Sequence, residues 1–172
     1  MNAILLVIPL IVIRYGLPKL ISNSANRRAG FFPPPAGIEK IMLNIYKITT
    51  MSLILLLAFF NIHFNKTYVH LGLGIYLIGL VLFILSIIDF ARANENSVIS
   101  KGVYRFSRNP MYVAFFLCFF GISLIINSWL YFLVLLIFQI SVHFLILGEE
   151  RWCCQEYGRE YEDYCQRVRR YI

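Results

Sequence analysis

Apolar residues fall in five long stretches along the chain, and short polar segments separate them. The stretches are residues 3–21, 48–64, 69–90, 111–126 and 128–148. A helix that crosses the hydrocarbon core of a bilayer needs about 20 mostly apolar residues. The pattern therefore predicts an all-α integral membrane bundle of about five transmembrane helices.

The last two stretches predict a helical hairpin. Residues 111–147 are almost entirely apolar and too long for one span, and Asn127-Ser128 is the only polar break. A tight turn there makes the two helices antiparallel. The segment before residue 111 then lies near the segment after residue 147, and polar residues concentrate in both. We expect one domain over residues 1–172, with N-terminal spans in 1–88 and a cofactor-binding catalytic region in 89–172.

Composition and charge agree with a membrane protein. Of the 172 residues, 59% are hydrophobic and 15% are charged, against roughly 25% charged in soluble domains. The net charge of +7 flanks the apolar stretches and forms no basic, aromatic-rich face, so we expect no nucleic-acid partner. Basic residues occupy the loops after the first and third stretches and the tail: Arg27, Arg28, Lys40, Lys47, Arg92, Lys101, Arg105, Arg108, Arg151, Arg159, Arg167, Arg169 and Arg170.

This charge distribution predicts the topology. Lys and Arg remain on the cytoplasmic side of membrane proteins, which places the N-terminus outside and an amphipathic tail in the cytoplasm. The membrane would be the inner membrane if the source is bacterial.

Several polar side chains lie where their burial is costly. Gln139 and His143 share one face of the fifth predicted helix, and Glu150 lies seven residues beyond His143. Glu149 and Glu150 end that helix, where the helix dipole opposes negative charge and a cationic partner is needed. A polar stripe of this kind lines a cavity or forms hydrogen bonds between helices, and the sequence leaves both interpretations open.

Two aromatic segments have alternative interpretations. The Phe-Phe-Pro-Pro-Pro run at 31–35 is typical of an interfacial linker, which we favour over the border of a substrate entrance. Tyrosines at 157, 161, 164 and 171 share a helix face; we favour interfacial anchoring over packing against a cofactor. Adjacent Cys153 and Cys154 lack the spacing of a zinc site, so no metal is expected.

Two motifs identify a family. Residues 102–104 (Gly-Val-Tyr) and 108–112 (Arg-Asn-Pro-Met-Tyr) resemble the Gly-x-Tyr … Arg-His/Asn-Pro-x-Tyr signature of a membrane methyltransferase family. Residues 149–150 (Glu-Glu) and 157–164 resemble its Glu-Glu … Phe-Gly-x-x-Tyr-x-x-Tyr ending. This family includes the isoprenylcysteine carboxyl methyltransferases and the phospholipid methyltransferases. The resemblance covers residues 89–172.

The resemblance implies a methyl transfer from S-adenosylmethionine, bound on the cytoplasmic side, to a lipophilic, lipid or prenylated acceptor that enters from the bilayer. The implied cofactor-binding residues are Asp89, Asn96, Ser97, Val98, Ile99, Tyr104, Asn109, Pro110, Met111, Tyr112 and Glu149. The candidate catalytic residues are Arg108, His143 and Glu150.

The chain departs from the family pattern at three positions. Asn109 stands where His is frequent, and Arg169 stands where Pro is usual. Leu145 occupies the position of an Arg that holds the acceptor carboxylate in carboxyl-methylating members. The last departure weakens the case for a prenylcysteine carboxylate acceptor and leaves methyl transfer as the reaction class.

Two other functions remain open at this level. Sterol reductases have a similar C-terminal architecture, so an NADPH-dependent membrane reductase is one alternative. A non-enzymatic membrane scaffold or transporter subunit is the other. A nucleotide competition assay would distinguish an NADPH-dependent reductase from a methyltransferase. Absence of a cofactor site would favour a scaffold or transporter subunit.

Overall fold

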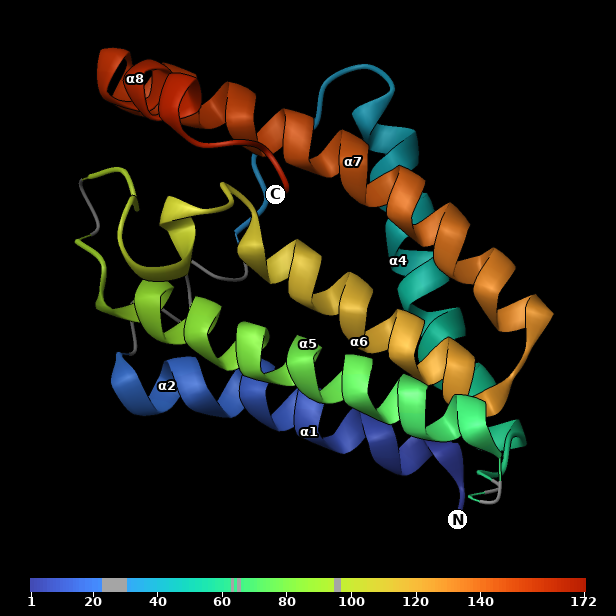
Figure 1. Cartoon of the computed structure of the whole chain (residues 1–172). Helices are drawn as coiled ribbons and strands as arrows, with labels where there is room; N and C mark the ends of the chain where they lie inside the picture. Colours follow the sequence, from blue (N-terminus) through green and yellow to red (C-terminus); the bar gives the residue numbers. More distant parts are fainter. Residues whose placement is uncertain (23–30, 63, 65, 95–96) are drawn as a thin grey trace.

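The computed structural model describes residues 1–22, 31–62, 64, 66–94 and 97–172, and within these residues it is helical without any strand. One isolated bridge joins Asn2 and Asn61. Figure 1 shows the arrangement. The elements are η1 (Ala3–Leu6), α1 (Val7–Ile11), η2 (Val12–Gly16), α2 (Leu17–Ile21), α4 (Glu39–Leu56), η3 (Leu57–Phe59), α5 (Thr67–Arg92), η4 (Gly102–Arg105), α6 (Pro110–Ile126), α7 (Trp129–Tyr157) and α8 (Arg159–Arg167).

Four of these helical segments are long and apolar enough to cross a membrane: Ala3–Ile21, Glu39–Phe59, Thr67–Arg92 and Trp129–Tyr157. The fifth predicted span, α6, is apolar but has only 17 residues. The integral membrane bundle is confirmed, and a fifth full-length span is not.

The boundaries of two spans differ from the predicted ones. The second was predicted at 48–64, but its helix begins at Glu39 and ends at Phe59. Lys40 and Lys47, which suggested a loop, are exposed on this helix, and long basic side chains are tolerated at a span end because they extend toward water. The last span, α7, was predicted to end at residue 148, but its helix continues to Tyr157.

Helices α5 and α6 lie side by side and are the most closely packed pair (Figure 1). Glycines make this approach possible. A Cβ atom on Gly121 would lie 2.6 Å from the carbonyl oxygen of Gly72, and one on Gly79 would lie 2.8 Å from the backbone nitrogen of Cys118. Small residues are the usual means by which membrane helices approach each other.

The α6–α7 hairpin turns at Asn127, which has a left-handed backbone (φ 48°). The Ser128 side chain then caps α7 by accepting a hydrogen bond from the Tyr131 N–H at 3.3 Å. This turn and the N-terminus lie at one end of the bundle, and the loop before α6, α8 and the C-terminus lie at the other (Figure 1). The predicted nearness of the two polar segments is therefore present.

The N-terminal segment is helical throughout Ala3–Ile21, but its middle is the wide π-turn η2. Pro18 lies just after this turn and has no N–H for the carbonyl of Arg14, four residues earlier. Proline in a helix also clashes with that carbonyl, and a π-turn is one way to accommodate it. Arg14 therefore belongs to a distorted turn of a mostly apolar helix, whose other basic residue, Lys19, lies near its end.

The glycine contact predicts the effect of one added methyl group. Gly121→Ala should lower the free energy of unfolding by about 1–3 kcal/mol, because the new Cβ meets rigid backbone on α5. Gly74→Ala is the control, since a Cβ there meets nothing within 4 Å and alanine favours a helix. Thermal unfolding of the detergent-purified variants measures both effects. Equal melting temperatures for the two variants would show that α5 and α6 do not pack this closely.

Candidate functional site

A cavity of about 560 Å³ lies at the end of the bundle that carries the polar loops. Pockets that hold small molecules and cofactors span roughly 300–1,000 Å³. The cavity is lined by Arg14, Phe31, Phe32, Pro33, Tyr46, Phe90, Ser97, Val98, Ile99, Tyr104, Arg108, Asn109, Met111, Tyr112, Phe115, Glu149, Glu150, Trp152, Cys153, Tyr157, Tyr161 and Tyr164. Most of these side chains are aromatic or aliphatic, so the polar groups among them are few and conspicuous.

Glu149 and Tyr112 form a direct contact between α7 and α6 in this cavity. The Tyr112 hydroxyl donates a hydrogen bond to Glu149 Oε1 at 2.6 Å. The bond fixes the direction of the carboxylate and leaves its second oxygen available to a ligand. Glu149 can therefore balance positive charge inside a largely apolar space.

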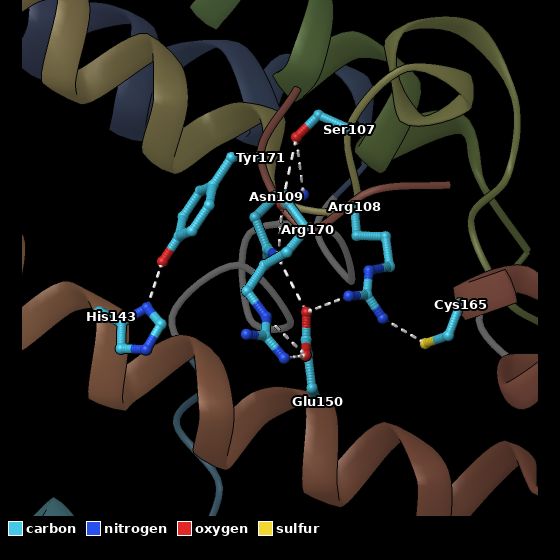
Figure 2. A network of polar contacts seen from close by, with 8 residues as sticks. All are labelled: Ser107, Arg108, Asn109, His143, Glu150, Cys165, Arg170 and Tyr171. Carbon is cyan, nitrogen blue, oxygen red and sulfur yellow. Dashed lines mark hydrogen bonds and ion pairs between the residues drawn. The ribbon is translucent and has the colours of Figure 1, made fainter. Parts of the chain in front are cut away.

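Glu150 is the centre of a separate polar network (Figure 2). Its side chain accepts from Arg170 through Nε at 3.0 Å and pairs with Nη2 at 2.8 Å. Arg108 Nη2 lies 3.5 Å away, and Asn109 Nδ2 donates at 3.3 Å. Arg108 also contacts Cys165 Sγ. A buried carboxylate needs such partners, because removing it from water is costly.

The network attaches the C-terminal segment to the start of α6. The Arg108 N–H donates to the carbonyl of Arg169 at 2.9 Å, and Asn109 Nδ2 donates to the carbonyl of Arg170 at 3.2 Å. Beyond them, the Tyr171 hydroxyl lies 2.6 Å from His143 Nδ1 (Figure 2). The hydrogen bond to Glu150 raises the pKa of Arg170, so the tail cation stays charged.

A tight turn builds the wall opposite α7. Gly102 has φ +59°, and a Cβ there would lie 1.8 Å from Asp89 Oδ2. The Asp89 carboxylate accepts the Val103 N–H at 2.8 Å, and the carbonyl of Tyr104 accepts the Tyr164 hydroxyl at 2.6 Å. Burial raises the pKa of both tyrosines, so their hydroxyls stay protonated at neutral pH.

Residues before α4 close another side of the cavity. Phe31 packs on Trp152 with ring centroids 5.3 Å apart, and Phe32 packs on Tyr46 at 6.0 Å. Arg151 holds this segment because it pairs with Glu39 and donates to the carbonyl of Pro34 at 3.3 Å. The aromatic run is thus a wall of the cavity, whereas interfacial linking was the favoured interpretation.

The structure brings most of the predicted site residues to the cavity. Those that line it are Ser97, Val98, Ile99, Tyr104, Arg108, Asn109, Met111, Tyr112, Glu149 and Glu150. Three others lie elsewhere: Asp89 on α5 against the Gly102 turn, Pro110 buried as the first residue of α6, and His143 against Tyr171. Asn96 lies outside the described residues, as do Arg27 and Arg28.

The sequence interpretation missed or misjudged several lining residues. Arg14 was not among the predicted site residues, although a charged residue within an apolar span is itself a signal of function. Tyr161 and Tyr164 were expected as interfacial anchors, but they are 7% and 4% exposed and line the cavity. Tyr46 carried no local signal. Among the described residues, no group of three or more His, Cys, Asp or Glu could hold a metal ion.

Comparison with known families gives a match over the C-terminal part of the chain. The sequence profile of the family described as "Phospholipid methyltransferase" matches residues 67–160, more than half of the chain. The matched range includes α5, α6 and α7 and therefore most of the cavity wall. No curated protein matches the chain.

The Glu150 network predicts a large effect of removing one charge. Glu150→Gln should lower the free energy of unfolding by about 3 kcal/mol, because it leaves the buried Arg108 guanidinium without its counter-charge. The released tail should also expose Arg167 and Arg169 to faster cleavage by trypsin. Thermal unfolding and limited proteolysis measure the two effects.

Glu156→Gln on the same helix is the matched control, since Glu156 is exposed. If Glu150→Gln melts and is cleaved like this control, the tail is not held by Glu150.

Proposed function

The chain belongs to the phospholipid methyltransferase family and is a membrane methyltransferase, and on this premise we propose that it transfers a methyl group from S-adenosylmethionine to a lipophilic acceptor in the bilayer. The observation that carries the proposal is the Glu149 carboxylate, oriented by Tyr112 within an aromatic cavity at one end of the bundle. Isoprenylcysteine-like acceptors are one such class.

The residues of the cavity fit this cofactor. S-adenosylmethionine has a sulfonium and an ammonium group, which are cationic, together with a carboxylate and an adenine. Glu149 balances positive charge, and rings such as Tyr104 and Tyr112 attract a cation through their faces or stack on a base. Arg108 Nε is buried and has no hydrogen-bond partner among the described residues, so it is a donor that the cofactor's carboxylate would satisfy.

The protein contributes to the reaction by positioning the methyl donor and acceptor and by excluding water from the site. The bound cofactor supplies a methyl group on a positively charged sulfur, which is electrophilic. Aromatic side chains from α6, α7, α8 and the segment at 31–33 exclude water. Holding donor and acceptor in line removes much of the entropic barrier, and exclusion of water strengthens the electrostatic contacts.

The remaining site residues have proposed roles. Ser97, Val98, Ile99, Asn109 and Met111 would contact the cofactor, together with the residues already discussed. Arg108 and Glu150 would act mainly by holding α6, α7 and the tail in register, because each is engaged in the network. His143 would position the tail through Tyr171. For Asp89, Asn96 and Pro110, direct contact with the cofactor remains a proposal.

We place this end of the bundle on the cytoplasmic side. The described basic residues of the loop before α6 and of the tail gather there, including Lys101, Arg105 and Arg159. Positive loops remain cytoplasmic, which is also where a soluble nucleoside cofactor is available.

Calorimetric titration of the detergent-purified protein with S-adenosylhomocysteine and S-adenosylmethionine tests the proposal. Wild type should bind both saturably. Glu149→Gln should weaken binding of S-adenosylmethionine by about tenfold or more, the effect of losing a charge-assisted interaction. Glu156→Gln, on the same helix and exposed, should bind as wild type does.

Absence of binding by a folded wild-type sample would overturn the cofactor assignment. Binding that Glu149→Gln and Glu156→Gln leave equally intact would place the cofactor away from Glu149.

A further inference from the structure

One side of the cavity is covered by residues 31–37, a segment that we call the strap. In Figure 1 it runs, in blue, past α7 and into α4. Phe31, Phe32 and Pro33 of the strap line the cavity. With the described part of the chain, residues 31–35 form no backbone–backbone hydrogen bond, and three of the five are prolines, which have no N–H. Segments with few backbone hydrogen bonds open most easily.

The opposite walls of the cavity are held more firmly. The start of α6 and the tail share the Glu150 network. The turn at Gly102 is held by Asp89, which accepts the Val103 N–H at 2.8 Å. The segment before this turn is held by α8, because Glu160 accepts the Val98 N–H at 3.1 Å. If one side of the cavity opens, these contacts single out the strap.

The strap has a stiff body and a hinge at its end. Three consecutive prolines, residues 33–35, fix the backbone angle φ, and proline runs behave as semi-rigid spacers. Gly37 follows with φ +52°, and a Cβ atom there would meet nothing within 4 Å. Rotation of the backbone at Gly37 would therefore move Phe31 and Phe32 together without a clash.

Two ring contacts close the strap from the cavity side. Phe31 packs on Trp152 with ring centroids 5.3 Å apart, and Phe32 packs on Tyr46 at 6.0 Å. Phe31 is nevertheless 51% exposed and Phe32 37% exposed. Because the hydrophobic effect scales with the apolar area removed from water, these half-exposed rings leave their partners more easily than rings of the core do.

An ion pair fastens the strap at its other edge. Arg151 on α7 pairs with Glu39 at the start of α4, and its Nη2 donates to Glu39 Oε2 at 2.9 Å and to the Pro34 carbonyl at 3.3 Å. Glu39 also accepts the Ala36 N–H at 2.8 Å. The Arg151 side chain is 40% exposed, and ion pairs that water reaches are weak. This pair is therefore a latch that can be released and formed again.

We propose that the strap is a lid over the cavity, fastened by the Glu39–Arg151 pair, and that it opens to let the soluble cofactor enter and leave. The strap lies at the loop end of the bundle, which faces water, whereas a lipophilic acceptor comes from the bilayer. This inference rests on the proposed methyl transfer, because it assigns the route of that reaction's cofactor. Both the strap and Glu39 lie outside residues 67–160, the range that the family profile matches.

Native cysteines report the opening of the lid without any cofactor. Cys153 lines the cavity next to Trp152, whereas Cys118 is buried on α6 against α5. Detergent-purified protein with the exposed Cys154 replaced by serine is treated with N-ethylmaleimide, and mass spectrometry follows the labelling of each thiol. In this background Glu39→Gln, which removes the charge but keeps an oxygen for Ala36, should label Cys153 about threefold faster or more. Cys118 should be labelled at an unchanged rate.

Three further variants assign the effect to the latch. Arg151→Gln should speed the labelling of Cys153 as Glu39→Gln does. The double variant should be no faster than either single one, because both substitutions remove the same pair. Lys40→Gln is the matched control, since Lys40 is the exposed neighbour of Glu39 on α4, and it should behave as the parent protein does.

The exchange of S-adenosylhomocysteine tests which ligand the lid admits. Surface plasmon resonance on the immobilised, detergent-purified protein gives its association and dissociation rate constants. Both should rise about threefold or more in Glu39→Gln, because opening precedes entry and exit. Their ratio, the Kd, should stay within about twofold of wild type, since the latch fastens the empty and the occupied protein alike.

The outcomes are separable from those of the proposed function. Unchanged labelling of Cys153 in Glu39→Gln overturns the lid, and so does an equal rise at Cys118, which means that the whole bundle has loosened. Faster labelling of Cys153 with unchanged exchange of S-adenosylhomocysteine overturns the cofactor route. Failure of folded wild type to bind S-adenosylhomocysteine overturns the cofactor assignment, while the labelling of Cys153 still decides the lid.

Discussion

The buried carboxylate of Glu150 is the constraint on which the site depends. A charge in this position is tolerated only with opposite charges beside it, and they come from Arg108 before α6 and Arg170 in the tail. The pairing joins three segments that are distant in sequence and fixes the rotation of α7 about its axis. Consecutive helix residues point about 100° apart, so with Glu150 turned toward the tail, Glu149 is turned toward Tyr112 and the cavity.

The two faces of this end of α7 have different roles: one face stabilises the fold, and the other faces the cavity. The Glu150 face carries the network that holds the tail. The Glu149 face looks into a cavity with aromatic walls supplied by α4, α6, α8 and the segment at 31–33. Close packing of α5 on α6 through glycines holds α6 in place, and α6 carries Tyr112. Membership of the phospholipid methyltransferase family makes the chain a membrane methyltransferase, and this arrangement supports our proposal that cofactor and acceptor meet at this end of the bundle.

The sequence predicted those features that depend on local pattern. The apolar stretches predicted a membrane bundle, and Asn127-Ser128 located the hairpin turn, because they are the only two consecutive polar residues in the apolar run. Tyr112 and Glu149 were found through motifs. Arg14, Tyr46 and Phe31 were missed as site residues because they reach the cavity only through packing between distant helices. The tyrosine stripe was predicted on one helix face, but only Tyr161 and Tyr164 lie on the same helix, because Tyr157 ends α7 and Tyr171 lies beyond α8. An amphipathic pattern also does not distinguish a lipid interface from a buried contact, and Tyr161 and Tyr164 are buried.

The most direct test of methyl transfer in this cavity uses S-adenosylmethionine labelled in its methyl group. Membranes that contain the protein are incubated with the labelled cofactor, and radioactivity in the organic-soluble lipid fraction is followed with time. The account predicts label in lipid with wild type, and a loss of that label with Glu149→Gln in membranes that hold the same amount of folded protein. Incorporation unaffected by that substitution, or none with wild-type protein that binds the cofactor and is supplied with both phosphate- and carboxylate-bearing lipids, would contradict it.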